Sequence, residues 1–528
     1  MVNRRSHASQ YRFQSSRKIV ALALAGGALL VLLLLVATPH GIGVSPDSVL
    51  YFKAAENLRS GDGFSQYNSA GELIPVTIAL PFYPLLLAVS SLAGGELAQT
   101  ARLLNGIFLA ALATWTAFVL WKLTSSKVYT ILGTLGVITA YGVLQSHLMA
   151  WTEVPFLLFT LVAVYLVATN RRHGMRRLLL AALVIGMALL TRYVAVALLI
   201  AAAVFLLIDQ VLGPSIRSSI CSQIRTSVSR EGGVRFTLLI GVSSLPLMLW
   251  FLRNMVSASS LTGRVLVWHP IGLAQVYQGF ATISQWALPG LHPVFGFIFV
   301  LLTASLVQVV PARQGSGHPL LQVSGLFALA YLTFLVLSIS VIDAYTPVDV
   351  RTLAPLQLFW LIWLTTLLAS TEKLLSSKPF VRLIPFAVMS LIVSLNVVTV
   401  IPLLTNSMTE GLGYSKRVWR SSETVAYLRT VPEERPICSN GDDVIHLYTG
   451  RYACRLPAEY SPIQQRSNPN FSSKMRSLLS RLAEQRGMVV YFDSINREYL
   501  PEVDELLGEY SLTVVKRTAD GIVLAPGD

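Results

Sequence analysis

The sequence predicts a mainly α-helical protein, a polytopic bundle of about eleven transmembrane helices followed by a small C-terminal α/β domain. Three observations lead to this fold class. Of the 528 residues, 53% are hydrophobic and only 13% are charged, whereas an average soluble domain has about 25% charged residues. The apolar residues form separate runs of membrane-spanning length. The excess of basic residues lies in the short segments between these runs.

The expected membrane helices are the uncharged or nearly uncharged apolar runs. They lie near residues 19–37, 99–121, 128–146, 152–169, 177–190, 192–208, 236–253, 293–310, 320–342, 353–370 and 383–404. The first run is longer than the apolar core of a cleaved signal peptide, so we expect it to remain as a membrane anchor. The stretch 177–208 is interrupted by Thr191-Arg192, which predicts two short helices that meet at the outer surface.

The distribution of charge predicts the orientation. Of the 26 Lys and Arg residues before residue 404, 19 fall on one side of the predicted spans, together with the N-terminus. The positive-inside rule places that side in the cytoplasm. Eleven spans then put the C-terminal domain outside the cytoplasm. Residues 404–528 are nearly neutral, with 15 basic and 16 acidic side chains. The net charge of +14 therefore does not indicate a nucleic-acid partner.

Two predicted outer loops are long, residues 38–98 and 254–292, and long ordered loops are uncommon unless they are functional. The first contains an amphipathic stretch, Asp47–Arg59, and then Pro81-Phe82-Tyr83-Pro84, which leads into an apolar run too short to span. We expect this short run to lie in or dip into the membrane surface.

The chain divides into a membrane domain, residues 1–404, and a soluble extracytoplasmic domain, residues 415–528. In the second domain helix-like and strand-like patterns alternate, which predicts a small layered βαβ-type domain. Its expected helices are 421–429, 443–448, 473–485 and 500–509, and its expected strands are 436–439, 488–492, 512–515 and 522–524. It has no GxGxxG motif and no P-loop, so nothing indicates a nucleotide.

The three cysteines indicate no metal site. Cys221 is alone in a predicted cytoplasmic loop. Cys438 and Cys454 both fall in the outer domain, on strands that could be neighbours. A disulfide is possible in that compartment, and two buried free cysteines are the alternative. No cofactor is expected, and a divalent metal is left open.

Charged residues from separate loops gather on the predicted outer side of the membrane, where a charge is costly and therefore informative. A site that binds a lipid phosphate and activates a hydroxyl needs arginines for the phosphate and a carboxylate for the proton. The gathered residues are Asp47, Glu56, Asp62, His147, Glu153, Arg192, Arg253, Arg264, Asp343, Asp349 and Arg351.

Several of these residues also have plain structural interpretations. Asp47 follows Ser45-Pro46 and precedes a helical pattern, so it could be an N-cap. Glu153 and Arg192 could be a structural ion pair. Arg253, at the end of its span, could extend its guanidinium into the headgroup layer.

Five segments in order resemble the bacterial GT-C glycosyltransferases, polytopic enzymes that use polyprenyl-phosphate sugars and include the protein-mannosyl, aminoarabinosyl and Rgt-type transferases. The matching segments are Pro46-Asp47-Ser48 through Gly61-Asp62-Gly63-Phe64 with Pro81-Phe82-Tyr83-Pro84, Thr152-Glu153-Val154-Pro155-Phe156, Leu190-Thr191-Arg192-Tyr193, Trp250-Phe251-Leu252-Arg253-Asn254 with Thr262-Gly263-Arg264, and Asp349-Val350-Arg351-Thr352-Leu353-Ala354-Pro355. Ser439-Asn440 and Thr449-Gly450-Arg451 resemble a bacterial subgroup with an added outer domain. Relatives often have Asp-Glu where this chain has Asp47-Ser48, and a charged residue where it has Ala79-Leu80.

The resemblance implies a GT-C-like membrane glycosyltransferase that transfers a sugar from a polyprenyl-phosphate donor to an extracytoplasmic glycan, glycolipid or protein, with inversion. Asp47 corresponds to the presumed general base of the family. An arginine would neutralise the leaving phosphate, where charge grows in the transition state. The expected substrate-binding residues are Tyr83, Glu153, Arg192, Arg253, Arg264, Asp349 and Arg351.

Two other classes of function fit a polytopic protein. A transporter or lipid flippase predicts acids in the middle of spans and inverted internal repeats, and the sequence shows no convincing repeat. A non-catalytic assembly or receptor protein would leave the ordered acid and arginine motifs of the membrane half unexplained.

Overall fold

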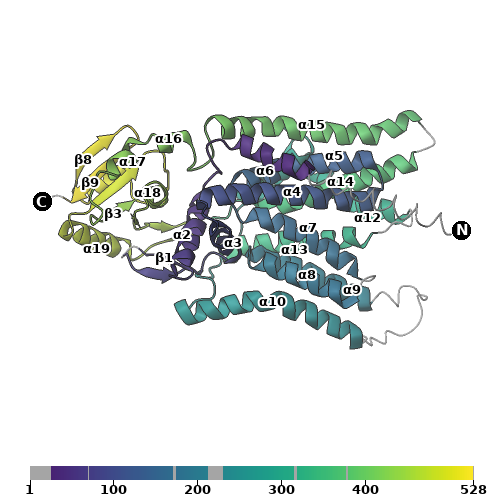
Figure 1. Cartoon of the computed structure of the whole chain (residues 1–528), viewed down its shortest axis with the longest axis horizontal. Coiled ribbons are helices and arrows are strands. Elements are labelled where there is room, and N and C mark those ends of the chain that lie inside the picture. The colour runs from purple at the N-terminus through teal and green to yellow at the C-terminus, as the bar shows by residue number, and fades with distance from the viewer. Residues whose placement is uncertain are drawn as a thin grey trace.

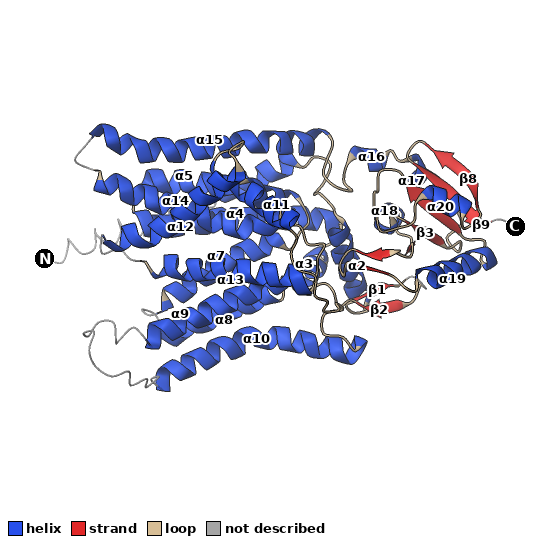
Figure 2. Cartoon of the chain, turned by 180° about the vertical axis from the view of Figure 1, so that it is seen from behind, coloured by secondary structure: helices blue, strands red, loops and turns tan. Residues whose placement is uncertain are grey.

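The computed structural model describes residues 25–68, 71–170, 174–211, 230–313, 318–375 and 379–526. These residues form a helix bundle with a smaller sheet-containing unit at one end of it (Figure 1). Helices α2 (Pro46–Ser60) and α3 (Phe82–Ser91) lie between the two parts. The strands all lie at that end of the molecule (Figure 2). The predicted fold class, a helical membrane bundle with a small C-terminal sheet, is confirmed.

The bundle contains helices from the N-terminal helix Ala25–Ala37 to α15. The others are α4 (Leu97–Thr124), α5 (Lys127–Ile138), α6 (Tyr141–Leu148), α7 (Glu153–Ala168), α8 (Gly174–Leu189), α9 (Val196–Val211), α10 (Arg230–Ala258), α11 (Leu273–Ala287), α12 (Pro293–Arg313), α13 (Pro319–Val341), α14 (Val350–Leu374) and α15 (Pro379–Thr409). Each predicted span overlaps one of these helices or, at 128–146, the pair α5 and α6.

Length and apolar composition allow five of the described helices to cross a membrane, namely α4, α10, α13, α14 and α15. α5 and α6 meet at an angle of 55° and would supply a sixth crossing if they are taken together. Several shorter apolar helices, such as α7, accompany them. The structure therefore supports a multi-span membrane protein, while the number of eleven crossings stays a prediction.

Helix α14 is the centre of the bundle. Every residue from Thr352 to Leu367 is buried, as expected of a helix that other helices surround on all sides. α6 approaches it closely at Gly142, where an added Cβ would collide with the carbonyl oxygen of Val350. This packing fixes the N-terminal end of α14, which carries Arg351, against the rest of the bundle.

The chain is broken between α8 and α9 at the predicted place. α8 ends at Leu189, and a 3₁₀ turn, η2 (Tyr193–Ala195), follows Arg192 before α9 begins. The carbonyl oxygen of Leu190 accepts a hydrogen bond from the backbone N–H of Phe82 in α3, at 3.1 Å. The break therefore brings Arg192 to the end of the bundle that faces the sheet-containing unit.

The C-terminal unit contains a five-stranded sheet with the order β4-β3-β7-β9-β8. β3 (Ile437–Ser439) runs parallel to both of its neighbours, whereas β9 is antiparallel to β7 and β8. The remaining elements are α16 (Arg417–Arg420), α17 (Glu423–Leu428), α18 (Asp442–Thr449), β4 (Cys454–Arg455), β5 (Tyr460–Ser461), β6 (Arg466–Ser467), α19 (Phe471–Glu484), β7 (Met488–Phe492), α20 (Val503–Gly508), β8 (Leu512–Thr518) and β9 (Gly521–Pro526). Every helix and strand predicted for this region is present.

A disulfide joins Cys438 of β3 to Cys454 of β4. Of the two alternatives that the sequence left open, the structure has the bonded pair. β4 itself has two residues and pairs in register with β3 through these cysteines. The prediction that the two cysteines lie on neighbouring strands is confirmed. The two-residue strands β5 and β6 show no periodicity in the sequence and were not predicted for this reason.

Candidate active site

Helix α2, which lies between the bundle and the C-terminal unit, begins with a capping box that holds Asp47 in its first turn. Ser45 is the N-cap, and its hydroxyl accepts a hydrogen bond from the backbone N–H of Ser48. In turn the Ser48 hydroxyl accepts a hydrogen bond from the backbone N–H of Ser45, at 3.0 Å. The interpretation of Asp47 as the N-cap is therefore wrong. Its side chain is 52% exposed, and the positive end of the helix dipole favours a carboxylate at this position.

Arg351 connects Asp47 to a second carboxylate. Its Nη2 atom lies 2.8 Å from Asp47 Oδ2, and its Nε atom lies 2.5 Å from Glu153 Oε1. The guanidinium also lies over the ring of Trp151, 4.1 Å from the ring centroid. One planar side chain is thus fixed by two carboxylates and an aromatic face, an arrangement that a lysine cannot reproduce.

Glu153 is the buried anion of the site. Its side chain is 1% exposed and forms ion pairs with both Arg351 and Arg192. A buried carboxylate is stable only when it is paired, and two guanidinium groups surround this one. Arg192, Arg351, Glu153 and Asp47 therefore form one network, which we call the charge network. Its four residues come from the α8–α9 break, α14, α7 and α2.

Aromatic residues surround the charge network. Tyr51 of α2 and Tyr83 of α3 are buried and pack edge to face, with ring centroids 5.6 Å apart. Burial, with the Asp47 carboxylate nearby, raises the pKa of Tyr51 above its ordinary value. Its phenol therefore stays protonated at neutral pH. Among the described groups the buried hydroxyl of Tyr83 has no hydrogen-bond partner.

Two of the predicted substrate-binding residues, Asp349 and Arg264, have other partners. Asp349 is the N-cap of α14 and accepts from the backbone N–H groups of Arg351 and Thr352, at 3.0 Å each. Arg264 forms an ion pair with Asp343. The structure therefore does not place Asp349 or Arg264 in the charge network.

Arg253 holds the first outer loop against α10. It donates to the carbonyl oxygens of Phe64 and Val76 at 2.6 and 2.8 Å. Its guanidinium lies 5.0 Å from the ring centroid of Trp250 and 5.8 Å from that of Phe64. Arg253 therefore contacts backbone and aromatic groups and does not belong to the charge network.

The segment before Asp47 is tied on both sides. Gly43 donates to the carbonyl oxygen of Leu148 and accepts from the N–H of Ala150, both at 2.8 Å, and Val44 accepts from the N–H of Tyr414 at 2.7 Å. Gly413 has a φ of +56°, and a Cβ there would collide with the carbonyl oxygen of Val44. We call these contacts the three-part tie. It fixes the start of α2, and with it Asp47, to both the bundle and the C-terminal unit.

The charge network contains two carboxylates, Asp47 and Glu153, and Arg351 bridges them. Nowhere among the described residues do three His, Cys, Asp or Glu side chains come together as a metal site.

Two aromatic residues of the site were not predicted from the sequence. Trp151 directly precedes Thr152-Glu153, and its indole N–H donates to the Ser45 hydroxyl at 2.9 Å. Tyr331, a polar residue within the span α13, is buried and donates to the carbonyl oxygen of Thr352 at 2.6 Å. A polar side chain inside a span is the signal that could have identified Tyr331.

Comparison with known proteins supports the same fold. Residues 80–226 match the family model described as dolichyl-phosphate-mannose-protein mannosyltransferase. None of the curated proteins compared with the chain matches it.

Solved structures match over nearly the whole chain. ArnT from Cupriavidus metallidurans, bound to undecaprenyl phosphate, has a TM-score of 0.57 at 12% identity, covering 97% of this chain and 98% of its own. The Archaeoglobus fulgidus oligosaccharyltransferase, in complex with Zn and sulfate, has a TM-score of 0.55 at 12% identity, covering 95% and 73%. AglB from the same organism, with an inhibitory peptide and a dolichol-phosphate, has a TM-score of 0.53 at 11% identity, covering 89% and 69%. The chain therefore has the fold of the GT-C membrane glycosyltransferases, and the predicted resemblance is confirmed.

Proposed function

We propose that this chain is a membrane glycosyltransferase that transfers a sugar from a polyprenyl-phosphate donor to an acceptor hydroxyl outside the cytoplasm. The charge network carries this proposal. It places the half-exposed carboxylate of Asp47 beside Arg351, which the Glu153 carboxylate links to Arg192, in a bundle with the GT-C fold. A glycosyl transfer from a lipid phosphate needs a base for the acceptor proton and cations for the phosphate.

In the proposed reaction Asp47 accepts the proton of the acceptor hydroxyl. The acceptor oxygen attacks the anomeric carbon from the face opposite the phosphate, and the bond from that carbon to the phosphate oxygen breaks. The configuration at the carbon is therefore inverted. The polyprenyl phosphate leaves with the bonding electron pair, so negative charge grows on its oxygen.

Arg351 and Arg192 would meet this growing charge. The two guanidinium groups share the buried Glu153 carboxylate. Their two positive charges exceed the single negative charge of Glu153 by one. Arg351 also holds Asp47 in the absence of a ligand. A phosphate that binds Arg351 would compete with Asp47 for the guanidinium and release the carboxylate to act as a base.

Tyr83 would add a hydrogen bond to the donor from its buried hydroxyl. Arg253, Arg264 and Asp349 would act at a distance, by holding the loops and the start of α14 around the site. The isoprenoid tail of the donor would lie among the apolar helices. The acceptor would be a glycan, a glycolipid or a protein, and residues 415–528 would help to bind it.

The position of the described charges favours a transferase over a transporter. The buried acid Glu153 is the first residue of α7, at the end of the bundle that faces the C-terminal unit. A proton- or ion-coupled transporter is expected to have acids near the middle of its spans. A receptor without catalytic activity would not need two partly buried arginines around one carboxylate.

The test is a comparison of membrane lipids and glycans between cells with and without this chain. Cells without it should accumulate one polyprenyl-phosphate sugar and contain an acceptor that lacks one sugar residue. Membranes that contain the chain should restore the acceptor when they are supplied with that donor. Unchanged polyprenyl-phosphate sugars and unchanged glycans would refute the proposed activity.

We further propose that the chain crosses a bacterial plasma membrane about eleven times, with the N-terminus in the cytoplasm and the C-terminal unit outside. The bias of basic residues supports this orientation. A reporter that is active only outside the cytoplasm should work when fused after Asp528 and be silent when fused after Met175. The reverse pattern would place the charge network on the wrong side for the proposed reaction.

A further inference from the structure

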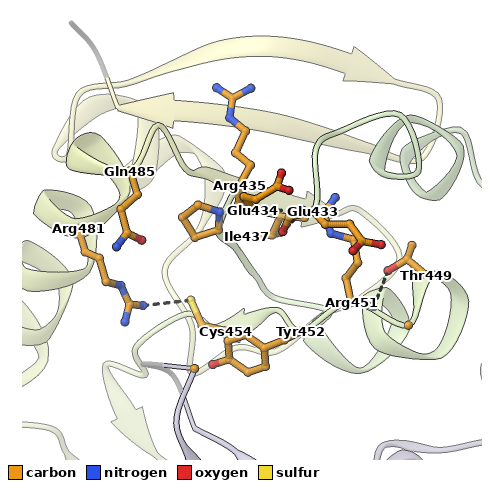
Figure 3. A pocket seen from close by; sticks show the side chains of 13 residues that line it. Glu433, Glu434, Arg435, Ile437, Thr449, Arg451, Tyr452, Cys454, Arg481 and Gln485 are labelled. Carbon is orange, nitrogen blue, oxygen red and sulfur yellow. Dashed lines mark hydrogen bonds between the residues drawn. The ribbon is translucent and has the colours of Figure 1, made fainter.

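The C-terminal unit contains a cavity of about 630 Å³ that is separate from the charge network (Figure 3). It is lined by Gly71, by the segments 433–437 and 449–452, and by Cys454. Arg481 of α19 and Gln485, the residue that follows α19, also line it. Asp47, Glu153, Arg192 and Arg351 do not line it. Its volume falls within the range of about 300–1,000 Å³ that small-molecule sites have.

On one wall of the cavity the guanidinium of Arg481 lies near the side-chain amide of Gln485. Arg481 and Gln485 are four residues apart, so they share one helical face, and both line the cavity (Figure 3). Arg481 Nη2 lies 3.8 Å from the sulfur of Cys454. A guanidinium has five N–H donors and can therefore serve a ligand as well as protein groups. This wall can bind a carboxylate or phosphate together with a hydroxyl.

The opposite wall is fixed by Arg451, which acts within the protein. Its Nη1 donates to the carbonyl oxygens of Leu428 and Val431 at 3.1 and 2.9 Å, and its Nη2 donates to that of Pro432 at 2.8 Å. Burial lowers the pKa of Arg451, while the acidic side chains of Glu433 and Glu434 oppose that shift. The two glutamates therefore balance Arg451, and their carboxylates can also accept from the hydroxyls of a ligand.

A rigid aromatic side chain completes the cavity. The hydroxyl of Tyr452 donates to the carbonyl oxygen of Asn68, and its ring contacts that of Tyr67 with centroids 5.8 Å apart. Tyr67 belongs to β1 (Ser65–Tyr67), which pairs with β2 (Leu73–Pro75). The cavity is thus attached to the outer loop whose first helix carries Asp47. An aromatic side chain beside arginine, glutamine and glutamate side chains can contact both the apolar face and the hydroxyls of a sugar.

We propose that this cavity binds a sugar unit that carries a negative charge, a carboxylate or a phosphate, and that it anchors the acceptor glycan outside the charge network. The identification of this sugar as part of the acceptor rests on the proposed function. The binding of an anionic sugar rests on the cavity alone. Arg481 contacts the negative group, and Gln485, Glu433 and Tyr452 contact the ring and its hydroxyls.

The test measures equilibrium binding to the full-length chain in lipid nanodiscs. Three oligosaccharides of equal length are compared, ending in glucuronic acid, in glucose 6-phosphate or in glucose. One or both of the anionic probes should bind about tenfold more tightly than the neutral one, the effect expected of a charge-assisted hydrogen bond. The tighter anionic probe identifies the negative group. Equal affinity for all three probes would overturn the proposal.

Two variants and one control test the assignment to this cavity. Arg481→Gln should abolish the preference for the anionic probe, and Gln485→Glu should do the same by placing a negative charge on that wall. Arg476→Gln changes an exposed arginine of the same helix that does not line the cavity, and it should retain the preference. A retained preference in both cavity variants, or an equal loss in the control, would contradict the assignment.

The same assay separates this proposal from the proposed function. Asp47→Asn should bind the anionic probe normally, because Asp47 does not line the cavity. Normal sugar transfer by a chain that does not prefer anionic probes would overturn the cavity proposal and leave the activity intact. Preferential binding of an anionic probe by a chain without transferase activity would overturn the proposed function and the identification of the ligand as its acceptor. The anionic-sugar site itself would stand.

Discussion

Replacement of Asp47 by Asn should reduce the rate of sugar transfer by about a hundredfold to ten-thousandfold, the contribution of a positioned general base. Asn has nearly the same shape and cannot take up the proton. Ser45 and not Asp47 caps α2, so the variant should fold, insert and accumulate like the unaltered chain. The measurement is transfer from a lipid-linked donor in membranes, normalised to the amount of protein.

Asp62→Asn is the matched control. Asp62 is an exposed loop residue directly after α2, and its variant should transfer sugar at close to the normal rate. An Asp47→Asn chain with a near-normal rate would remove Asp47 from the mechanism. The function would then depend on the fold and on the arginines alone.

Replacement of Arg351 by Lys should reduce transfer by about a hundredfold to a thousandfold, the effect of removing one donor that stabilises the transition-state charge. Arg351 uses separate nitrogen atoms to hold Glu153 and Asp47 and stacks on Trp151. A lysine keeps the charge but has a single nitrogen and no planar face. Transfer is compared at equal protein level and at saturating donor, so that a loss in the chemical step is separated from weaker binding.

The control for this variant is Arg382→Lys. Arg382 pairs with Glu372, which lies near the opposite end of α14 from Arg351, and both side chains are partly exposed. An exposed ion pair contributes little, so Arg382→Lys should be nearly normal. If Arg351→Lys were also normal, the phosphate contact could not depend on this guanidinium, and Arg192→Lys would become the decisive variant.

The sequence was sufficient to predict the helices and the side on which the charges gather. Hydropathy and charge identify spans because the membrane accepts few alternatives to an apolar helix. The interruption at Thr191-Arg192 and the alternation of helices and strands after residue 415 are visible in the same way. The four residues of the charge network were all among the predicted site residues, although their roles remain proposals.

The sequence offered one ion pair, Glu153 with Arg192, which the structure contains, but it could not predict the other pairs. Arg264 with Asp343 and Arg351 with Glu153 are contacts between distant segments, and they depend on how the helices pack. The capping of α2 by Ser45 was missed for a local reason, because Asp47 and Ser45 are both good N-cap residues. The disulfide depends on the register of β3 and β4, which a two-residue strand does not reveal.

The three-part tie has a consequence for the order of events during synthesis. The hydroxyl of Ser415 donates to the carbonyl oxygen of Ile42, a contact across 373 residues. At roughly 5–20 residues per second, the ribosome would need on the order of 20–75 seconds to make the chain between them. Asp47 would therefore be made early, while the last residues that hold the start of α2 would be made near the end of translation. Under the proposed function, a nascent chain would already contain Arg192 and Arg351, yet Asp47 would be held in place only when residues 413–415 dock.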